Sequence, residues 1–362
     1  MNKMGFGFLR FVQDANGEID FEKINKLTDK YMERGGRYFD TAWTYLDGKS
    51  EEAIKRCLAE RYPRESFELC DKLPGYLVKE PQECRQYFST QLLRCGVEYF
   101  DVYMLHWLNE KNYAIAQAQK EFEFLKEIKA EGLARKIGFS FHDSPQLLDK
   151  ILTEYPEVDV VLMQINYLDW DSASVQSRRC YETAVAHGKE VMVMEPCKGG
   201  TLAKLPEEAA GVLKEISPDA SPASWALRFA QSVPGVVRVL SGMNEISQIE
   251  DNMRDVSPLC EEELAALQRV TQILNGVGAV PCTGCRYCVN HCPMSIPIPD
   301  CFAVYNDLKR FPDDGWKMAH AYRELEKKVP LSSCIACGSC ADHCPQHIEI
   351  PQRLKQIAEE MK

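Results

Sequence analysis

Two cysteine runs near the C-terminus share one spacing, and they constrain the fold of this 362-residue chain more than any other feature. Each run reads C-x2-C-x2-C-x3-C-P. The first run is Cys282, Cys285, Cys288 and Cys292, and the second is Cys334, Cys337, Cys340 and Cys344. The offset of 52 residues between Cys282 and Cys334 also carries His291 onto His343 and Ile296 onto Ile348. A repeat of this kind indicates one structural unit used twice.

The spacing of both runs resembles that of bacterial ferredoxins, whose cysteine thiolates hold two 4Fe–4S clusters. In that pattern three closely spaced cysteines bind one cluster, and the fourth reaches the other cluster. We therefore expect two crossed ligand sets. One set is Cys282, Cys285, Cys288 and Cys344, and the other is Cys334, Cys337, Cys340 and Cys292.

Zinc and disulfides are the two alternatives for these cysteines. Zinc sites use pairs of C-x2-C and four ligands, without a third cysteine in register. Disulfides need an oxidising compartment, whereas iron–sulfur thiolates indicate a cytoplasmic protein. The net charge of −11 argues against nucleic acid and anionic membrane surfaces as partners. No apolar run approaches the length of a membrane span.

Short apolar segments alternate with longer amphipathic segments along the first 250 or so residues. The expected strands are Lys3–Phe6, Arg37–Asp40, Phe67–Cys70, Asp101–Leu105, Lys136–Phe139, Val160–Gln164, Glu190–Met194 and Val236–Leu240. Eight strand–helix units of this kind predict an α/β fold, a (β/α)8 TIM barrel. A doubly wound open sheet is the alternative, but Gly5-Phe6-Gly7 is too short for the glycine fingerprint of such sheets.

The expected helices of the barrel include a single long helix over Ile115–Ala130. A glycine-rich stretch around Gly276 predicts the domain boundary. We expect the barrel over residues 1–276 and a largely helical, ferredoxin-like domain over residues 277–362, with helices at Asp300–Arg310 and Gly315–Lys328.

Polar residues at the C-terminal ends of barrel strands are the catalytic candidates. Asp40 ends the second strand, Lys72 follows the third and His106 follows the fourth, while Tyr45 lies in the loop after the second. The segments FDTAWTY, CDKLP and MLHWL resemble the Asp, Tyr, Lys and His motifs of the aldo/keto reductase family. With the two cysteine runs, the chain resembles the iron–sulfur-containing members of that family.

The resemblance implies hydride transfer from a nicotinamide dinucleotide to a carbonyl, with Tyr45 as the general acid. A tyrosine pKa near 10 is high for this task at neutral pH. We expect the Lys72 ammonium to lower the pKa of Tyr45. Asp40 would hold Lys72 charged and oriented, and His106 would orient the carbonyl and donate to its oxygen.

The resemblance also assigns contacts to the cofactor. Ser140 and Gln164 match the residues that hold the carboxamide, Met194 replaces the aromatic residue that stacks on the nicotinamide, and Asn252 matches an adenine contact. Gly242 and Gln248 stand where the family has a lysine and an arginine for the 2′-phosphate of NADP. The choice between NADPH and NADH is therefore open, with Lys198 or Arg238 as candidate replacement cations.

The leading prediction is an oxidoreductase that joins a carbonyl-reducing barrel to electron transfer through two 4Fe–4S clusters. One alternative is a non-catalytic, dinucleotide-binding electron carrier or docking protein. Another is a plain carbonyl reductase with structural clusters. Expected partners are a small carbonyl substrate and an external electron carrier. A flavin is a further candidate cofactor, because a hydride carries two electrons and a cluster accepts one.

Overall fold

The computed structural model describes residues 3–11, 18–172, 175–254, 257–310 and 315–361. The chain divides into two compact units. The first comprises residues 1–169, 176–196 and 227–258, and the second comprises residues 170–175, 197–226 and 259–362. The boundary that the sequence predicts at residue 276 stays a prediction.

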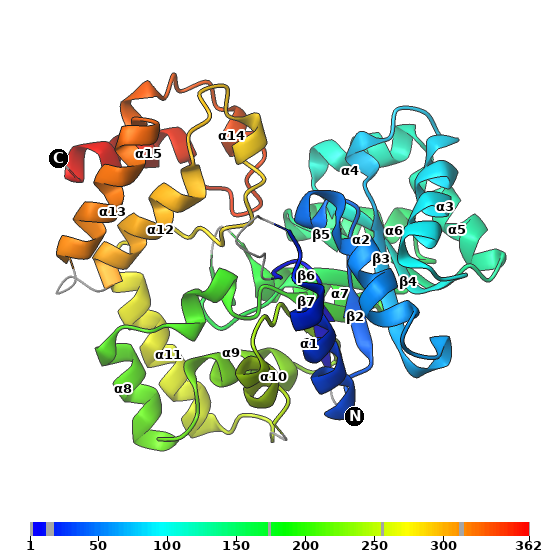
Figure 1. Cartoon of the computed structure of the whole chain (residues 1–362), viewed down its shortest axis with the longest axis horizontal. Coiled ribbons are helices and arrows are strands. Elements are labelled where there is room, and N and C mark those ends of the chain that lie inside the picture. Colours follow the sequence, from blue (N-terminus) through cyan, green and yellow to red (C-terminus); the bar gives the residue numbers. More distant parts are fainter. Residues whose placement is uncertain (1–2, 12–17, 173–174, 255–256, 311–314, 362) are drawn as a thin grey trace. The chain divides into compact units, whose positions relative to one another are not determined.

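The first unit is built on a closed barrel of parallel strands, each hydrogen-bonded to the next in chain order, with the last paired to the first (Figure 1). The strands are β1 (Met4–Gly7), β2 (Tyr38–Asp40), β3 (Glu68–Leu73), β4 (Phe100–Leu108), β5 (Ala134–Phe141), β6 (Val160–Gln164), β7 (Glu190–Met194) and β8 (Val236–Ser241). The predicted (β/α)8 barrel is thus confirmed. The strands are almost wholly buried, as parallel strands covered by helices should be.

Helices alternate with these strands. They are α1 (Phe21–Glu33), α2 (Ser50–Ile54), α3 (Glu83–Cys95), α4 (Glu110–Ala118), α5 (Glu121–Ala130), α6 (Pro145–Glu154), α7 (Ser177–Ala186), α8 (Glu207–Ile216), α9 (Pro222–Ser232) and α10 (Ile246–Asn252). Local sequence sets several of their ends. Ser144 caps α6 by accepting from the Leu147 N–H, and Pro145 occupies its first turn. Gly96 ends α3 in the left-handed conformation, at a φ of 69°.

The single helix expected over Ile115–Ala130 is wrong. The chain instead forms α4 and α5, which are separated at Lys120, where the backbone adopts a φ of 56°. A residue in this left-handed conformation cannot continue a right-handed helix. The break buries Glu121 at the start of α5, with 1% of its surface exposed.

The barrel interior holds side chains from six strands. Its buried cluster consists of Tyr38, Cys70, Val102, Met104, Val160, Leu162, Met192 and Leu240. Cys70 and five other cysteines outside the two runs are buried, where a free cysteine usually serves as a small apolar side chain. The barrel is therefore a packed core.

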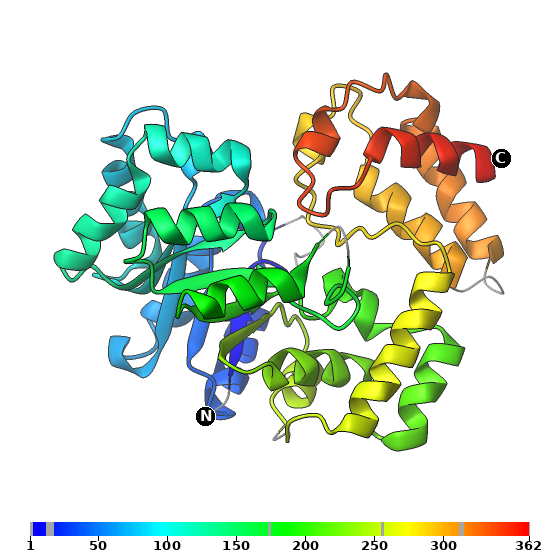
Figure 2. The same ribbon diagram turned by 180° about the vertical axis from the view of Figure 1, so that it is seen from behind.

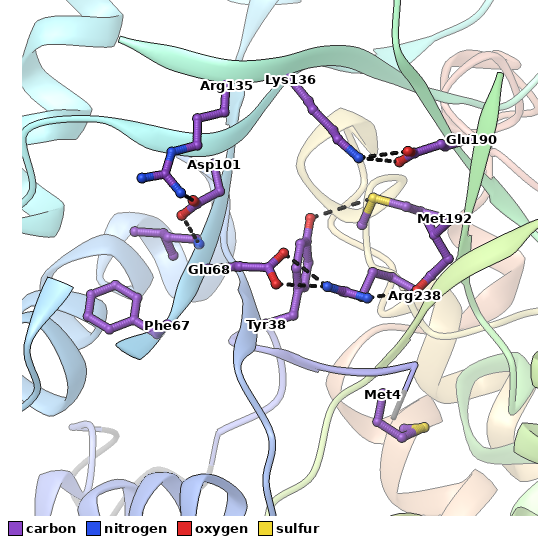
Figure 3. Close-up of polar contacts among 12 residues, drawn as sticks. Met4, Tyr38, Phe67, Glu68, Asp101, Arg135, Lys136, Glu190, Met192 and Arg238 are labelled. Atoms are coloured by element: carbon purple, nitrogen blue, oxygen red, sulfur yellow. Dashed lines mark hydrogen bonds and ion pairs between the residues drawn. The ribbon is translucent and has the colours of Figure 1, made fainter. Parts of the chain in front are cut away.

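Two ion pairs cross the amino-terminal end of the barrel (Figure 3). Arg238 of β8 donates two hydrogen bonds to the Glu68 carboxylate of β3, at 2.8 and 3.0 Å. Lys136 of β5 pairs with Glu190 of β7 at 2.6 Å. These side chains line a cavity of about 660 Å³, whose wall includes Tyr38. The ion pairs connect strands that are not neighbours in the barrel.

The second unit is helical apart from its loops, among the residues described. Besides α8 it contains α11 (Glu261–Gly276), α12 (Ile298–Arg310), α13 (Gly315–Lys328), α14 (Ser339–Asp342) and α15 (Ile350–Glu360). The two helices expected between the cysteine runs are confirmed as α12 and α13. Helices α8 and α11 lie side by side (Figure 1 and Figure 2). No helix in the described ranges is both long and apolar enough to cross a bilayer.

The cysteine runs surround a separate core in this unit. Ile296 and Ile348, which the repeat relates, are both buried in it, with Phe302 and Leu354. Asn306 of α12 is almost fully buried and fixes the segment before the first run. Its side chain accepts from the Val280 N–H and donates to the Val280 carbonyl, both at 2.7 Å. The buried side-chain amide of Asn306 thus has a partner for both its oxygen and its nitrogen.

Candidate active site and cluster sites

The four catalytic candidates lie together at the carboxyl ends of β2, β3 and β4. The Lys72 ammonium donates to Asp40 Oδ1 and to the Thr41 carbonyl, each at 2.7 Å. Its Nζ lies 4.9 Å from the centre of the Tyr45 ring. The Tyr45 and His106 rings meet edge to face, with centroids 5.8 Å apart. The sequence thus predicts a group of side chains that the fold brings into contact.

Burial and nearby charges set the protonation of these groups. Burial lowers the pKa of Lys72, but Asp40 and then Tyr45 outweigh it, so the net pKa lies above its ordinary value. Burial, followed by the Lys72 charge, holds the pKa of His106 well below its usual range. At neutral pH Lys72 is therefore charged and His106 is neutral.

Tyr45 departs from the expected electrostatics. Lys72 does act to lower the pKa of Tyr45, but burial is the larger effect and raises that pKa to about 12. The expectation of a lowered pKa is therefore wrong for this structure. The phenol stays protonated at neutral pH, and a protonated phenol can donate to a developing oxyanion.

A bulge in β4 aims His106. The pairing of β4 with β5 shifts register between Leu105 and Leu108, and Trp107 adopts a φ of 63°. Bulges of this kind redirect side chains next to active sites. The Trp107 N–H donates to Ser140 Oγ at 2.7 Å, and Asn112 Nδ2 donates to the Trp107 carbonyl at 2.7 Å. Sequence alone predicted a strand ending at Leu105 and missed the role of Asn112.

Tyr76 is a second residue that sequence reasoning missed. It belongs to the 3₁₀ turn Gly75–Leu77 after β3. Its ring lies 6.0 Å from that of His106 and 5.6 Å from that of Trp107, and its hydroxyl is 3.3 Å from Thr44 Oγ1. It therefore adds an aromatic wall beside the four catalytic candidates, which form the tetrad of this site. A single tyrosine after a predicted strand carries no sequence signal for this position.

The residues predicted to hold the nicotinamide end follow the neighbouring strands. Ser140 lies near the end of β5, and Gln164 and Met194 are the paired last residues of β6 and β7. Gln164 Nε2 and Asn166 Nδ2 both donate to Asp169 Oδ2, at 2.5 and 2.8 Å, which fixes the Gln164 amide. These buried polar side chains at adjacent strand ends suit a ligand with a carboxamide.

The residues after β8 make the following contacts within the protein. Gln248 Oε1 accepts from the Asn244 N–H at 2.7 Å and helps to cap α10. Asn252 Nδ2 donates to Ser241 Oγ at 3.2 Å. Gly242 lies against Arg10, since a Cβ built on Gly242 would be 3.3 Å from Arg10 Cβ. Arg10 follows β1 in sequence, and only the pairing of β1 with β8 places it here.

The two cations that the sequence suggests as replacements, Arg238 and Lys198, do not lie beside Gly242 as Arg10 does. Arg238 pairs with Glu68 at the amino-terminal end of the barrel, opposite to the tetrad, so its suggested role is wrong. Lys198 is buried, at 3% exposed, in the 3₁₀ segment Lys198–Ala203 of the second unit.

The cysteine runs enclose two small cavities in the second unit. One is lined by Cys282, Cys285, Cys288 and Cys344, and the other by Cys334, Cys337, Cys340 and Cys292. These are the crossed ligand sets that the spacing predicts. The Gly284 N–H and the Ile296 N–H approach Cys282 Sγ and Cys292 Sγ at 3.4 Å, as donors to ligating sulfur do. Four sulfurs around each cavity fit a polynuclear cluster.

Comparison with known proteins agrees with this geometry. The model of the aldo/keto reductase family matches residues 3–272, which is most of the chain. The chain belongs to the aldo/keto reductase family. A 4Fe-4S dicluster domain model matches residues 281–349 of the same reductase. This aldo/keto reductase is therefore an oxidoreductase that carries an iron–sulfur domain of ferredoxin type.

Its relatives are distant. The oxidoreductase YqkF of Bacillus subtilis (strain 168) is 22% identical over 305 residues, covering 75% of this reductase and 93% of YqkF. The NADH-specific methylglyoxal reductase of Escherichia coli (strain K12) is 24% identical, covering 52% and 60%. The holo form of aldo-keto reductase AKR11C1 from Bacillus halodurans has a TM-score of 0.61 at 23% identity, covering 74% and 91%. That structural likeness supports the barrel fold.

Proposed function

We propose that this reductase transfers a hydride from a nicotinamide dinucleotide to a small carbonyl substrate at the tetrad. The observation that carries the proposal is the buried Lys72–Asp40 ion pair beneath the Tyr45 ring, with the His106 ring packed edge to face against that of Tyr45. A buried ammonium with a protonated phenol beside it is arranged to receive the negative charge that develops on a carbonyl oxygen.

Each residue has a distinct part in this proposal. The dinucleotide supplies the hydride when it is bound. Tyr45 donates its proton to the carbonyl oxygen, and Lys72 stabilises the phenolate that remains. Asp40 keeps Lys72 charged through the 2.7 Å contact. Neutral His106 orients the carbonyl and donates a hydrogen bond to it.

The proposed cofactor contacts are Ser140, Gln164 and Met194 at the nicotinamide end, and Gly242, Gln248 and Asn252 at the adenosine end. The relatives differ in cofactor. One is named an NADH-specific reductase, and an aldo-keto reductase from Klebsiella pneumoniae, 20% identical with a TM-score of 0.60, was solved in complex with NADPH. We assign the 2′-phosphate contact to Arg10, which packs on Gly242. One guanidinium in place of two cations supports a weak preference for NADPH.

The second part of the proposal concerns electrons. Two 4Fe–4S clusters, one in each cysteine-lined cavity, would store one electron apiece and exchange electrons with an external carrier. The loop of the second cysteine run supports this exchange, because it is open to solvent. Cys337 is exposed, and Ile335, which follows Cys334, is 62% exposed. A cluster close to the surface is accessible to a redox partner.

The test of the hydride-transfer site is Tyr45→Phe. Loss of the proton donor should reduce carbonyl reduction by about 10²-fold or more. Dinucleotide affinity, measured by fluorescence titration, should stay at the wild-type value, because Tyr45 contacts the substrate oxygen. Methylglyoxal is a suitable first substrate, since it appears in the names of several relatives. Tyr76→Phe is the matched control, because Tyr76 is a neighbouring tyrosine that is not proposed to donate a proton to the substrate. Turnover at the wild-type rate by the Tyr45 variant would show that Tyr45 is not the proton donor in this protein.

A second measurement separates the proposed roles of the iron–sulfur domain. Anaerobic protein is mixed with NADPH, with and without methylglyoxal, while dinucleotide oxidation, carbonyl reduction and cluster bleaching are followed together. Bleaching that follows dinucleotide oxidation supports electron transfer. Carbonyl reduction without any bleaching supports a plain reductase with structural clusters, and bleaching with no carbonyl reduction supports a dinucleotide-binding electron carrier.

A further inference from the structure

The repeat in the iron–sulfur domain brings two histidines into contact. His291 and His343 each precede the fourth cysteine of their run. Their imidazole rings stack face to face, with centroids 3.5 Å apart and planes inclined by 9°. His291 ends the 3₁₀ turn Val289–His291, and His343 caps the C-terminus of α14. Two equivalent positions of the repeat thus meet at one point.

Each ring also lines a different cysteine cavity. His291 lines the cavity of Cys292 and the second run, and His343 lines the cavity of Cys344 and the first run. Neither histidine lines the other cavity. The stack is therefore a point at which the wall of one cavity directly touches the wall of the other.

Packing of the domain core does not account for this stack. The core consists of buried side chains such as Ile296, Phe302 and Leu354. His291 is exposed and His343 is half-buried, so neither contributes a large apolar surface to that core. His343 is nevertheless held in a defined orientation, because its Nδ1–H donates to the Ser339 carbonyl at 2.7 Å.

We propose that the His291–His343 stack couples the two cluster sites, so that a change at one ring alters the reduction potential of both clusters. This inference rests on the two-cluster part of the proposed function. The potential of an iron–sulfur cluster depends on hydrogen bonds to its sulfurs and on its exposure to solvent. Loss of one ring frees the face of the other, which can then move and admit water to its own cavity. Two coupled one-electron sites together hold the two electrons of one hydride.

The experiment compares His343→Leu with His343→Phe in the full-length, anaerobically purified protein. The midpoint potentials of both clusters are measured by a redox titration followed by electron paramagnetic resonance. The signals are assigned with Cys285→Ser and Cys337→Ser, each of which changes one ligand set. Leucine should shift the equilibrium of the cluster held by the second run about tenfold, or about 59 mV for a one-electron couple. That cluster occupies the cavity that His343 does not line.

Phenylalanine keeps an aromatic ring in the stack and should leave the potential of that cluster at its wild-type value. An unchanged potential in the leucine variant, or equal shifts with leucine and phenylalanine, would overturn the coupling. The mirrored pair, His291→Leu and His291→Phe, is read at the cluster of the first run. His320→Leu, an exposed histidine on α13, is the control for loss of a histidine from this domain.

Iron and acid-labile sulfide are counted in every variant. If the leucine variant loses iron, the cavities from which the iron is lost test the coupling instead of the potentials. Loss from both cavities with full iron in the phenylalanine variant supports coupling, whereas loss only from the cavity that the substituted ring lines overturns it. Wild-type protein with a single cluster would instead overturn the two-cluster proposal, which distinguishes that failure from a failure of the coupling.

Discussion

Lys72 illustrates how one residue can keep a charge inside a barrel. An ammonium without a partner would lose its proton on burial, since desolvation disfavours the charged form. Asp40 at 2.7 Å and the Thr41 carbonyl at 2.7 Å replace its hydration. Burial, and then the same charge, lowers the pKa of His106. The buried ion pair therefore adds to the larger effect of burial in keeping His106 neutral.

Glu121 is a buried carboxyl group with a different consequence. Burial alone raises its pKa to about 8, above the usual value of a glutamate. Below the pKa of the unfolded chain, both states are protonated and no stability is lost. As the pH rises from that value toward 8, the unfolded state ionises while the folded state keeps its proton, so stability falls by about 1.4 kcal/mol per pH unit at most.

Glu121→Gln should remove this dependence. The variant should be more stable than the wild type at pH 8, and the difference should vanish near pH 4, as measured by urea unfolding across this range. Glu123→Gln on the exposed face of the same helix is the control. Parallel stability profiles for wild type and Glu121→Gln would show that Glu121 is ionised in the folded protein.

Arg10 carries the prediction about cofactor choice. Arg10→Met keeps the packing of its stem on Gly242 but removes the guanidinium. Affinity for NADPH should fall about tenfold, which corresponds to about 1.4 kcal/mol for one charged contact to phosphate. Affinity for NADH should stay unchanged. Titration of both dinucleotides checks the prediction, and equal losses for the two would assign Arg10 to a part of the cofactor that they share.

At the scale of the element, the end of β4 is the most unusual segment of the barrel. A strand that continued with regular alternation would direct successive side chains to opposite faces. The bulge at Trp107 interrupts this alternation, and the φ of 63° there is uncommon for a residue other than glycine. Two hydrogen bonds hold the bulge, one from the Trp107 N–H to Ser140 Oγ and one from Asn112 Nδ2 to the Trp107 carbonyl.

Asn112→Ala tests how far His106 depends on this bulge. The substitution leaves the Trp107 carbonyl without its side-chain donor, which should cost about 1–3 kcal/mol of stability. Because the bulge aims His106, kcat should fall as well, while dinucleotide affinity stays constant. Denaturant unfolding and steady-state kinetics measure the two effects. Lys111→Ala, at an exposed position on α4, should alter neither.

At the scale of the whole molecule, the two units have separate cores and separate means of closure. The barrel closes through strand pairing, supplemented at its amino-terminal end by the Arg238–Glu68 and Lys136–Glu190 ion pairs. The iron–sulfur domain surrounds its small core with cysteine loops. Loops of this kind need a metal centre to hold them, as in other small metal-binding domains.

The prediction at this scale is the metal content. Anaerobically purified protein should contain about eight iron atoms and about eight acid-labile sulfides per chain, as two 4Fe–4S clusters require. Replacing Cys344 by serine should lower occupancy of the cavity that contains Cys282, because Cys344 belongs to that ligand set. Stoichiometric zinc without sulfide would contradict the assignment.

The sequence by itself determined the repeating features of this protein. Strand order, the barrel and the positions of β6 and β7 follow from apolar periodicity, which depends on local spacing alone. The crossed cysteine sets follow from the doubled run. The tetrad was recognisable because its members lie at strand ends and in segments that resemble the motifs of the aldo/keto reductase family.

Tertiary structure decided what depends on contacts between distant segments. The net pKa of Tyr45 reflects burial, which spacing cannot predict. Arg10 meets Gly242 only because β1 pairs with β8, and the paired Arg238 proved to lie at the other end of the barrel. The break before Glu121 and the bulge at Trp107 each depend on one residue with a positive φ. A positive φ is uncommon for residues other than glycine, so the local sequence does not predict it. The sequence aligned His291 with His343, but only the fold brought their rings together.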